Sequence, residues 1–167
     1  MRKSLLLDAD VLIDLHSLGL FQRICKSYHV HLTRKVLEEA PFYKKQGAKY
    51  KIDISADVTI IESIGIESLG KVQNEAKEAR LGIDPGESAS IAYIDETDKE
   101  ITFCTCDKAA IKLISYMNLE ERSISVENAL RNAGYREKNL YPRHLEKSFK
   151  ECIKEGKALR IQFKRLV

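Results

Sequence analysis

The chain of 167 residues has no long apolar run. No segment approaches the ~20 consecutive apolar residues that cross a bilayer. The apolar stretch near the N-terminus, Leu5–Leu7, is too short for a signal peptide. Internal repeats, low-complexity segments and Ser/Gly-rich linkers are also missing. We therefore expect a single domain without a membrane segment, located in the cytoplasm.

Metal-binding and nucleophilic patterns are equally scarce. His29 and His31 alternate along a presumed strand with no third ligand nearby, and no Ser/His pair stands out as a nucleophile. The cysteines show no metal-ligand spacing, and two of them alternate within the strand-like "ITFCTC". We expect reduced, mostly buried thiols at Cys25, Cys104, Cys106 and Cys152.

The composition, 44% apolar and 32% charged, is that of a soluble globular protein with a sizeable core. The charge is unevenly distributed. Residues 131–167 hold 11 Lys/Arg and 4 Asp/Glu, a balance of +7, whereas residues 1–130 hold 17 and 21, a balance of −4. A basic tail on an acidic body fits a polyanion that meets a carboxylate-lined site. A solvated helix face explains the tail equally well.

Short apolar runs alternate with segments of helical periodicity. Strands are expected at 4–7, 28–32, 58–63 and 101–106, with a short strand or turn near 123. Helices are expected at 11–25, 34–45, 68–82, 87–97 and 108–117, with a further helix that ends at Gly134 and another in the tail. The first should break near Gly19. The second should have Thr33 as its cap and end or kink at Pro41, and the third should be closed by Gly82. Residues 47–57 are expected to be a loop.

This alternation predicts a three-layer α/β/α fold with a mostly parallel sheet and a helical C-terminal extension. We expect one domain over residues 1–167, with a core over about 1–117 and the extension over about 118–167. Ligands in such folds bind beyond the carboxyl ends of the strands.

Acidic residues fall at that edge. Asp8 follows the first core strand and Asp107 follows "ITFCTC", while Glu87 opens a helix after "DPG" and Glu38 and Glu39 lie in the helix after the second strand. Each acid has an ordinary explanation by itself, such as a helix cap at Asp107 or a favourable helix dipole at Glu87. Together they predict an oxygen-only site for Mg²⁺ or Mn²⁺ and metal-assisted phosphodiester hydrolysis. Asp14 is expected on a helix surface.

In these motifs the chain resembles the PIN-domain nucleases. The family begins with an apolar strand, Asp, any residue, usually Asn or Ser, and an apolar triplet; "LLLDADVLI" follows this order with Asp10 in place of the Asn or Ser. The segments "TRKVLEEA", "GIDPGESASIAYI" and "ITFCTCDKAAIK" match its later motifs in order. The resemblance covers residues 4–115. The Gly-Glu pair in the third motif is characteristic of one branch of the family.

The resemblance implies a metal-dependent ribonuclease with Asp8, Glu39, Glu87 and Asp107 as catalytic, Mg²⁺- or Mn²⁺-binding acids. Glu39 is preferred over Glu38, which stays a supporting candidate. Such enzymes are often toxins of type II toxin–antitoxin pairs, so RNA is the implied substrate, with an antitoxin protein and a second copy of the chain as candidate partners.

The resemblance also suggests roles for three neighbours of the acids. Asp10 would orient Asp8 or add a ligand, and Thr105 would support the turn at Asp107. Lys108, where the family often has a further acid, would guide the RNA backbone.

Two other functions fit part of the pattern. A non-catalytic PIN-like module would bind RNA or a protein without cutting, although its acids would be expected to be lost. The "DAD" doublet is also found in haloacid dehalogenase-type phosphatases, but this chain has Leu12 where that family has Thr or Val, and Asp107 lacks the second acid expected beside it.

Overall fold

The computed structural model describes residues 1–54 and 58–164. Its strands are β1 (Lys3–Leu7), β2 (Tyr28–Thr33), β3 (Phe42–Lys45), β4 (Ala48–Lys51), β5 (Val58–Ile61), β6 (Ile101–Cys104) and β7 (Ser123–Ile124). Its helices are α1 (Ala9–Ser17), α2 (Phe21–Ser27), α3 (Arg34–Glu39), α4 (Ile66–Glu78), α5 (Pro85–Glu96), α6 (Lys108–Tyr116), α7 (Val126–Asn132) and α8 (Glu146–Lys164), with single 3₁₀ turns at Glu120–Arg122 and Pro142–His144.

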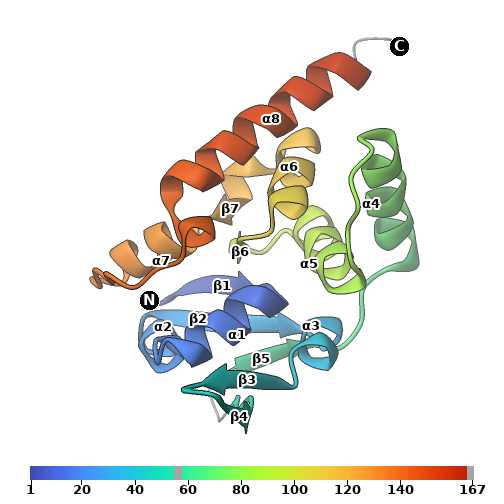
Figure 1. Ribbon diagram of the computed structural model, residues 1–167. Helices are drawn as coiled ribbons and strands as arrows, with labels where there is room; N and C mark the ends of the chain where they lie inside the picture. The colour runs from blue at the N-terminus through green and yellow to red at the C-terminus, as the bar shows by residue number, and fades with distance from the viewer. Residues whose placement is uncertain (55–57, 165–167) are drawn as a thin grey trace.

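Five strands form one sheet in the order β5-β2-β1-β6-β7, and every neighbouring pair in it is parallel. Helices cover both faces (Figure 1), which confirms the predicted three-layer α/β/α class. The strand order reverses beside β1, since the chain adds strands first on the β2 side and later on the β6 side. In open parallel sheets ligands bind at such a reversal, which here falls at the carboxyl ends of β1 and β6.

The core is divided by the sheet. Successive side chains of β1 point to opposite faces, so Leu5 and Leu7 pack with α1, α2 and α7, whereas Leu6 packs with α4, α5 and α6. All three leucines are buried. A strand that is apolar on both faces is typical of a parallel sheet covered on both sides, which is why the run of three leucines predicted this strand correctly.

The tail packs back onto the body. In Figure 1, α8 lies along α6, and the two helices approach closely at Gly156, where an added Cβ would lie 2.3 Å from the carbonyl oxygen of Lys112. Lys112 and Glu155 form an ion pair between the same helices at 2.5 Å. The last helix of the expected extension is therefore docked on α6, whereas β7, near the start of that extension, belongs to the central sheet. In the part of the chain that the structure describes, no helix has the length and apolarity needed to span a membrane.

The segment after α3 differs from the sequence prediction. The helix expected over 34–45 ends at Glu39, and residues 42–51, expected to be helix and loop, form the β3–β4 hairpin. Its two turn residues, Gln46 and Gly47, both have positive φ, 50° and 78°, which is the backbone of the tight turns that join twisted strands. Residues 55–57 of the expected loop lie outside the described residues.

The end of α4 also differs. The helix stops at Glu78 rather than reaching Gly82, and Arg80 takes the left-handed conformation with φ of 58°. The backbone N–H of Leu81 then donates to the carbonyl of Ala76, closing the helix two residues before the glycine.

Candidate functional site

Asp8 and Asp107 lie at the carboxyl ends of neighbouring strands. Leu7 of β1 is in register with Cys104 of β6, and the backbone N–H of Asp8 continues the ladder by donating to the Cys104 carbonyl at 3.1 Å. Both aspartates are helix N-caps: Asp8 accepts from the Ala9 N–H and Asp107 from the Ala110 N–H. The two strands therefore place both carboxylates at the point where the strand order reverses.

Thr105 joins the two strand ends. Its hydroxyl donates to Asp8 Oδ2 at 2.8 Å, and its Oγ1 accepts the backbone N–H of Asp107 at 3.2 Å. Both Asp8 and Thr105 are buried. One hydroxyl thus fixes the orientation of the first carboxylate and the turn that carries the second.

Glu87 enters the same region from the start of α5. Asp84 caps this helix by accepting the Glu87 N–H at 2.8 Å, and Glu87 Oε2 in return accepts the Asp84 N–H at 3.1 Å. This is a reciprocal capping box, with Pro85 at the first helical position. The carboxylate of Glu87 is buried although its helix starts near the surface.

Asp84 is an acid that the sequence analysis did not single out. Its charge acts on Asp8, Asp10, Glu39 and Glu87, so it belongs electrostatically to the cluster. The sequence did hold a signal for it. Asp84-Pro85-Gly86-Glu87 has the Asp-x-x-Glu spacing of a capping box, which ties the position of Asp84 to that of Glu87.

Glu39, and not Glu38, faces the start of α5. Glu39 Oε1 accepts the backbone N–H of Gly86 at 2.9 Å. The approach needs a glycine, because a Cβ on residue 86 would lie 2.1 Å from Glu39 Oε2. The carboxylate of Glu38 instead pairs with Lys35 at 3.1 Å on the other side of α3.

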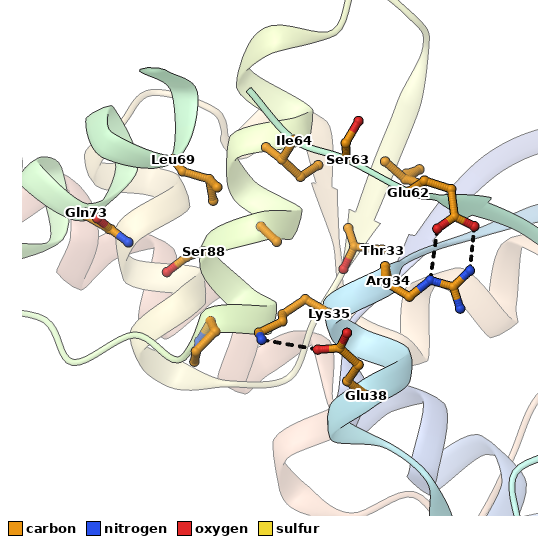
Figure 2. A pocket seen from close by; sticks show the side chains of 13 residues that line it. Thr33, Arg34, Lys35, Glu38, Glu62, Ser63, Ile64, Leu69, Gln73 and Ser88 are labelled. Carbon is orange, nitrogen blue, oxygen red and sulfur yellow. Dashed lines mark hydrogen bonds and ion pairs between the residues drawn. The ribbon is translucent and has the colours of Figure 1, made fainter. Parts of the chain in front are cut away.

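That other side of α3 borders a cavity of about 310 Å³ between α3, α4, α5 and the ends of β2 and β5. Figure 2 shows Glu38 and Lys35 at its rim, with Arg34 and Glu62 paired beside them. Among the predicted acids only Glu38 lines this cavity. The cavity is therefore a neighbour of the acidic cluster and not part of it.

Burial and the charges of neighbouring carboxylates both raise pKa values in the acidic cluster. Burial raises the pKa of Asp8 to about 7, against the lowering effect of the Thr105 hydrogen bond. Burial also raises the pKa of Glu87, to about 9, and the charges of Asp8 and Asp107 add to the effect. Burial and the charge of Asp84 raise the pKa of Glu39. A cluster of this kind favours protons, or another cation, at neutral pH.

Asp10 and Lys108 lie at the edge of the cluster. Asp10 is exposed in the first turn of α1, and its pKa is raised by partial burial and by the charges of Asp14, Asp107 and Asp84, while Arg143 lowers it. Lys108 is exposed and is the first residue of α6, directly after Asp107. The structure thus brings both predicted supporting residues close to the strand ends without burying either one.

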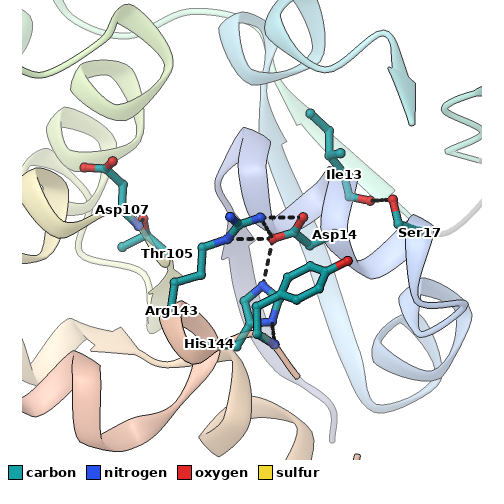
Figure 3. A network of polar contacts seen from close by, with 8 residues as sticks. Ile13, Asp14, Ser17, Thr105, Asp107, Arg143 and His144 are labelled. Carbon is teal, nitrogen blue, oxygen red and sulfur yellow. Dashed lines mark hydrogen bonds and ion pairs between the residues drawn. The ribbon is translucent and has the colours of Figure 1, made fainter. Parts of the chain in front are cut away.

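The expectation for Asp14 was wrong. Asp14 is 7% exposed and accepts hydrogen bonds from the guanidinium of Arg143, at 2.7 to 3.1 Å, and from His144 Nε2 at 2.7 Å. Burial alone would raise the pKa of Asp14, but the hydrogen bonds from His144 and Arg143 outweigh it and lower the pKa. Figure 3 shows Arg143 between Asp14 and the Thr105–Asp107 segment.

Asp14 also belongs to a group that could hold a metal, since ligand atoms of Asp14, Cys106 and His144 lie within 4.8 Å of one another. The Asp14 carboxylate and the His144 ring in this group already form hydrogen bonds within the protein. His144 Nδ1 accepts the Tyr141 N–H, which assigns the ring proton to Nε2 and directs it at Asp14. Burial raises the pKa of the Cys106 thiol above its usual range, which disfavours the thiolate that a metal needs. We interpret the group as a structural link between α1 and the tail.

The cysteine prediction is confirmed: Cys25, Cys104, Cys106 and Cys152 are all reduced and buried. Comparison of the chain with protein-family models, with curated proteins and with solved structures gives no match. The function therefore has to be inferred from the fold and from the chemistry of the acidic cluster.

Proposed function

We propose that the chain is a metal-dependent ribonuclease that hydrolyses RNA phosphodiester bonds with Mg²⁺ or Mn²⁺. The observation that carries the proposal is that Asp8 and Asp107 follow neighbouring strands at the reversal of strand order, where their charges act on the buried Glu87. Ligands of open parallel sheets bind at this position. The motifs that resemble PIN-domain nucleases supply these same residues.

The donor set fits a hard divalent ion. The cluster offers carboxylate oxygens only, from Asp8, Glu87 and Asp107, with Glu39 and Asp84 at its border. Oxygen-only sites select Mg²⁺ or Mn²⁺, which keep bound waters and accept phosphate oxygens. Burial, together with the charges of neighbouring carboxylates, raises the pKa of Asp8 and of Glu87, and a bound cation would offset both effects.

Each protein group has a distinct task in this mechanism. Backbone N–H groups and the Thr105 hydroxyl orient the carboxylates before any ligand arrives. Bound Mg²⁺ or Mn²⁺ would supply Lewis acidity toward the phosphate and lower the pKa of a coordinated water. The exposed ammonium group of Lys108, next to Asp107, is placed to attract the phosphate backbone.

The resemblance adds a biological setting. In it the ribonuclease is the toxin of a type II pair, held inactive by an antitoxin and able to form a homodimer. A cytoplasmic location agrees with four reduced cysteines, which persist in a reducing compartment. Induced expression of the wild-type chain should then arrest growth, and Asp107→Asn should restore it.

The direct test is cleavage of end-labelled single-stranded RNA with Mn²⁺ and with EDTA. We expect Asp8→Asn and Asp107→Asn each to lower the rate on the order of 100-fold or more. Asp95→Asn is the matched control, because Asp95 lies on α5 but pairs with Lys71 at 2.6 Å outside the cluster. Calorimetric titration with Mn²⁺ should show binding to the wild type and not to Asp8→Asn/Asp107→Asn. Cleavage that survives EDTA or both substitutions would refute the proposal, and RNA binding without cleavage would favour a non-catalytic module.

A further inference from the structure

The β3–β4 hairpin carries a surface whose side chains are unusually basic and aromatic. Cross-strand partners share a face, and the register pairs Phe42 with Lys51 and Lys44 with Lys49. All four of these side chains are exposed, and Phe42 is 44% exposed. We call the set Phe42, Lys44, Lys49 and Lys51 the outer hairpin face.

The opposite face of the hairpin holds it to the body. Tyr43 is half-buried, stacks on Tyr50 and lies 5.3 Å from the ring of His16 on α1. His16 itself stacks on Phe21 at 4.3 Å. The strand after the turn is followed by the buried Ile52, whose N–H donates to the Pro41 carbonyl. The hairpin is thus anchored by one face, which leaves the other free.

The outer hairpin face lacks compensating charge. None of its three lysines pairs with a carboxylate in the described ranges 1–54 and 58–164, and Lys49 lies instead over the Phe42 ring at 4.3 Å. Lys44 and Lys49 are directly opposite each other, an arrangement that destabilises a strand pair. A polyanion on this face would turn that repulsion into attraction.

The basic tail differs in this respect. Lys112, Lys157 and Lys164 on α6 and α8 pair with Glu155, Glu120 and Glu75. Much of the positive charge near α8 is therefore engaged inside the protein. The prediction that the basic tail fits a polyanion rests on a count of charges, and such a count cannot show that these charges are paired.

The hairpin also lies next to the acidic cluster. It begins three residues after Glu39, whose carboxylate accepts the Gly86 N–H at the start of α5. From there it runs along α1, and Lys45 Nζ near its turn lies 4.0 Å from the position of a Cβ on Gly19. Figure 1 shows β3 and β4 beside α1, below the sheet edge. A bound strand could extend from the acids along this hairpin.

We propose that the outer hairpin face binds single-stranded RNA and guides it toward the acidic cluster, an inference that rests on the proposed ribonuclease function. Lysines would follow the phosphate backbone, and Phe42 would stack on a base. Such combinations of basic and aromatic side chains are typical of surfaces that bind single strands. Two other polyanions fit this surface less well. The bases of an RNA duplex are stacked inside the helix and an acidic protein has no bases, so neither could stack a base on Phe42.

The test is fluorescence anisotropy with a labelled 12-nucleotide oligouridylate in EDTA, where binding is measured without cleavage. The lysine variant is Lys44→Gln/Lys49→Gln/Lys51→Gln, and its control is Lys147→Gln/Lys150→Gln/Lys154→Gln on α8, which removes the same charge. We expect the hairpin variant to weaken binding and to lower the slope of log Kd against log salt by about 2, since each phosphate contact in a single strand contributes about 0.7. The α8 control should change neither by as much.

A second variant, Phe42→Leu, separates stacking from charge. It should weaken binding of the single strand roughly fivefold or more while leaving the salt slope unchanged. A 12-base-pair RNA duplex and polyglutamate are the comparison probes. Three outcomes would overturn the proposal. The α8 control could lose as much RNA affinity as the hairpin variant, the duplex or polyglutamate could bind as tightly as the single strand, or Phe42→Leu could leave the affinity unchanged.

The outcome is separable from the nuclease test. If the wild-type chain binds RNA through the hairpin but does not cleave it, the proposed RNA-binding surface stands and the proposed ribonuclease function is refuted. If the hairpin variants cleave RNA at an unchanged rate and bind it with unchanged affinity, the ribonuclease function stands and the RNA-binding surface is refuted. Removing the lysine repulsion should leave the melting temperature of the triple variant equal or higher, so a loss of binding would not reflect unfolding.

Discussion

The hydroxyl of Thr105 donates to Asp8 across the ends of two parallel strands, 97 positions apart in the chain, at 2.8 Å. Both residues are buried, so the bond is protected from water and holds the Asp8 carboxylate in one orientation. Because the same oxygen accepts the Asp107 N–H, a change at Thr105 reaches both strand-end acids.

Replacing Thr105 with Val should weaken the site more than the fold. The substitution keeps the shape but removes the donor to Asp8, and we expect the free energy of unfolding to fall by about 1–3 kcal/mol. Affinity for Mn²⁺ should fall about 10- to 100-fold, as for other groups that orient a ligand. Urea unfolding and calorimetric titration measure the two effects. Thr105→Ser keeps the hydroxyl and should keep the affinity; equal affinity in Thr105→Val would contradict the role of the bond.

The metal-free protein should lose stability as the pH rises. The pKa of Asp8 is raised to about 7 and that of Glu87 to about 9, both above unfolded values near 4. Between about pH 4 and about pH 9 the native state therefore binds more protons than the unfolded state, and the free energy of unfolding decreases with pH. Urea unfolding in EDTA at pH 5, 7 and 9 measures the trend.

The same experiment has two controls. Asp8→Asn/Glu87→Gln should flatten the pH dependence, and Mn²⁺ should stabilise the wild type more at pH 8 than at pH 5. Stability in EDTA that increases from pH 5 to pH 9 would show that the two carboxyl groups are not held in a proton-favouring environment.

Asp14→Asn should destabilise the protein by about 2–3 kcal/mol, because it removes the charge that pairs with Arg143 and accepts from the fully buried His144. Asp10→Asn, one helical turn earlier on α1, removes an exposed acid of the cluster and should stay within about 0.5 kcal/mol of the wild type. Urea unfolding at pH 7 compares them. Equal effects of the two variants would mean that Asp14 does not hold the tail to α1.

Gly86→Ala should displace Glu39 and leave the fold intact. The added Cβ would meet the end of the Glu39 side chain, which can rotate away. We expect a change of less than about 2 kcal/mol in the free energy of unfolding and a clear loss of Mn²⁺ affinity. Gly70→Ala is the control, since nothing lies within 4 Å of its added Cβ in the interior of α4, and it should stabilise by roughly 0.5–1 kcal/mol. Unchanged affinity in Gly86→Ala would exclude Glu39 from the site.

Local patterns predicted the layers of this fold because they reflect local physics. The apolar run at Leu5–Leu7, the cap at Thr33 and the break at Gly19 each act within a few residues of themselves. The sequence does not predict the hairpin, because Pro41 fits the end or kink of a longer helix and the turn at Gln46–Gly47 is a short signal.

For the candidate site, sequence order alone predicted that Asp8 and Asp107 follow core strands, since parallel strands end at one edge. It could not reveal the environment of Asp14. Asp14 falls between the apolar positions Leu12 and Leu15, and its partners Arg143 and His144 come 129 and 130 positions later. Only the docking of the tail buries that carboxylate.

The link between Asp14 and His144 has a consequence for synthesis. A ribosome makes α1 and its acids long before it makes the Pro142–His144 turn. Until that turn emerges, Asp14 lacks the guanidinium that neutralises it and the imidazole N–H that donates to it. The nascent chain must therefore carry this charge unpaired until translation has passed residue 144.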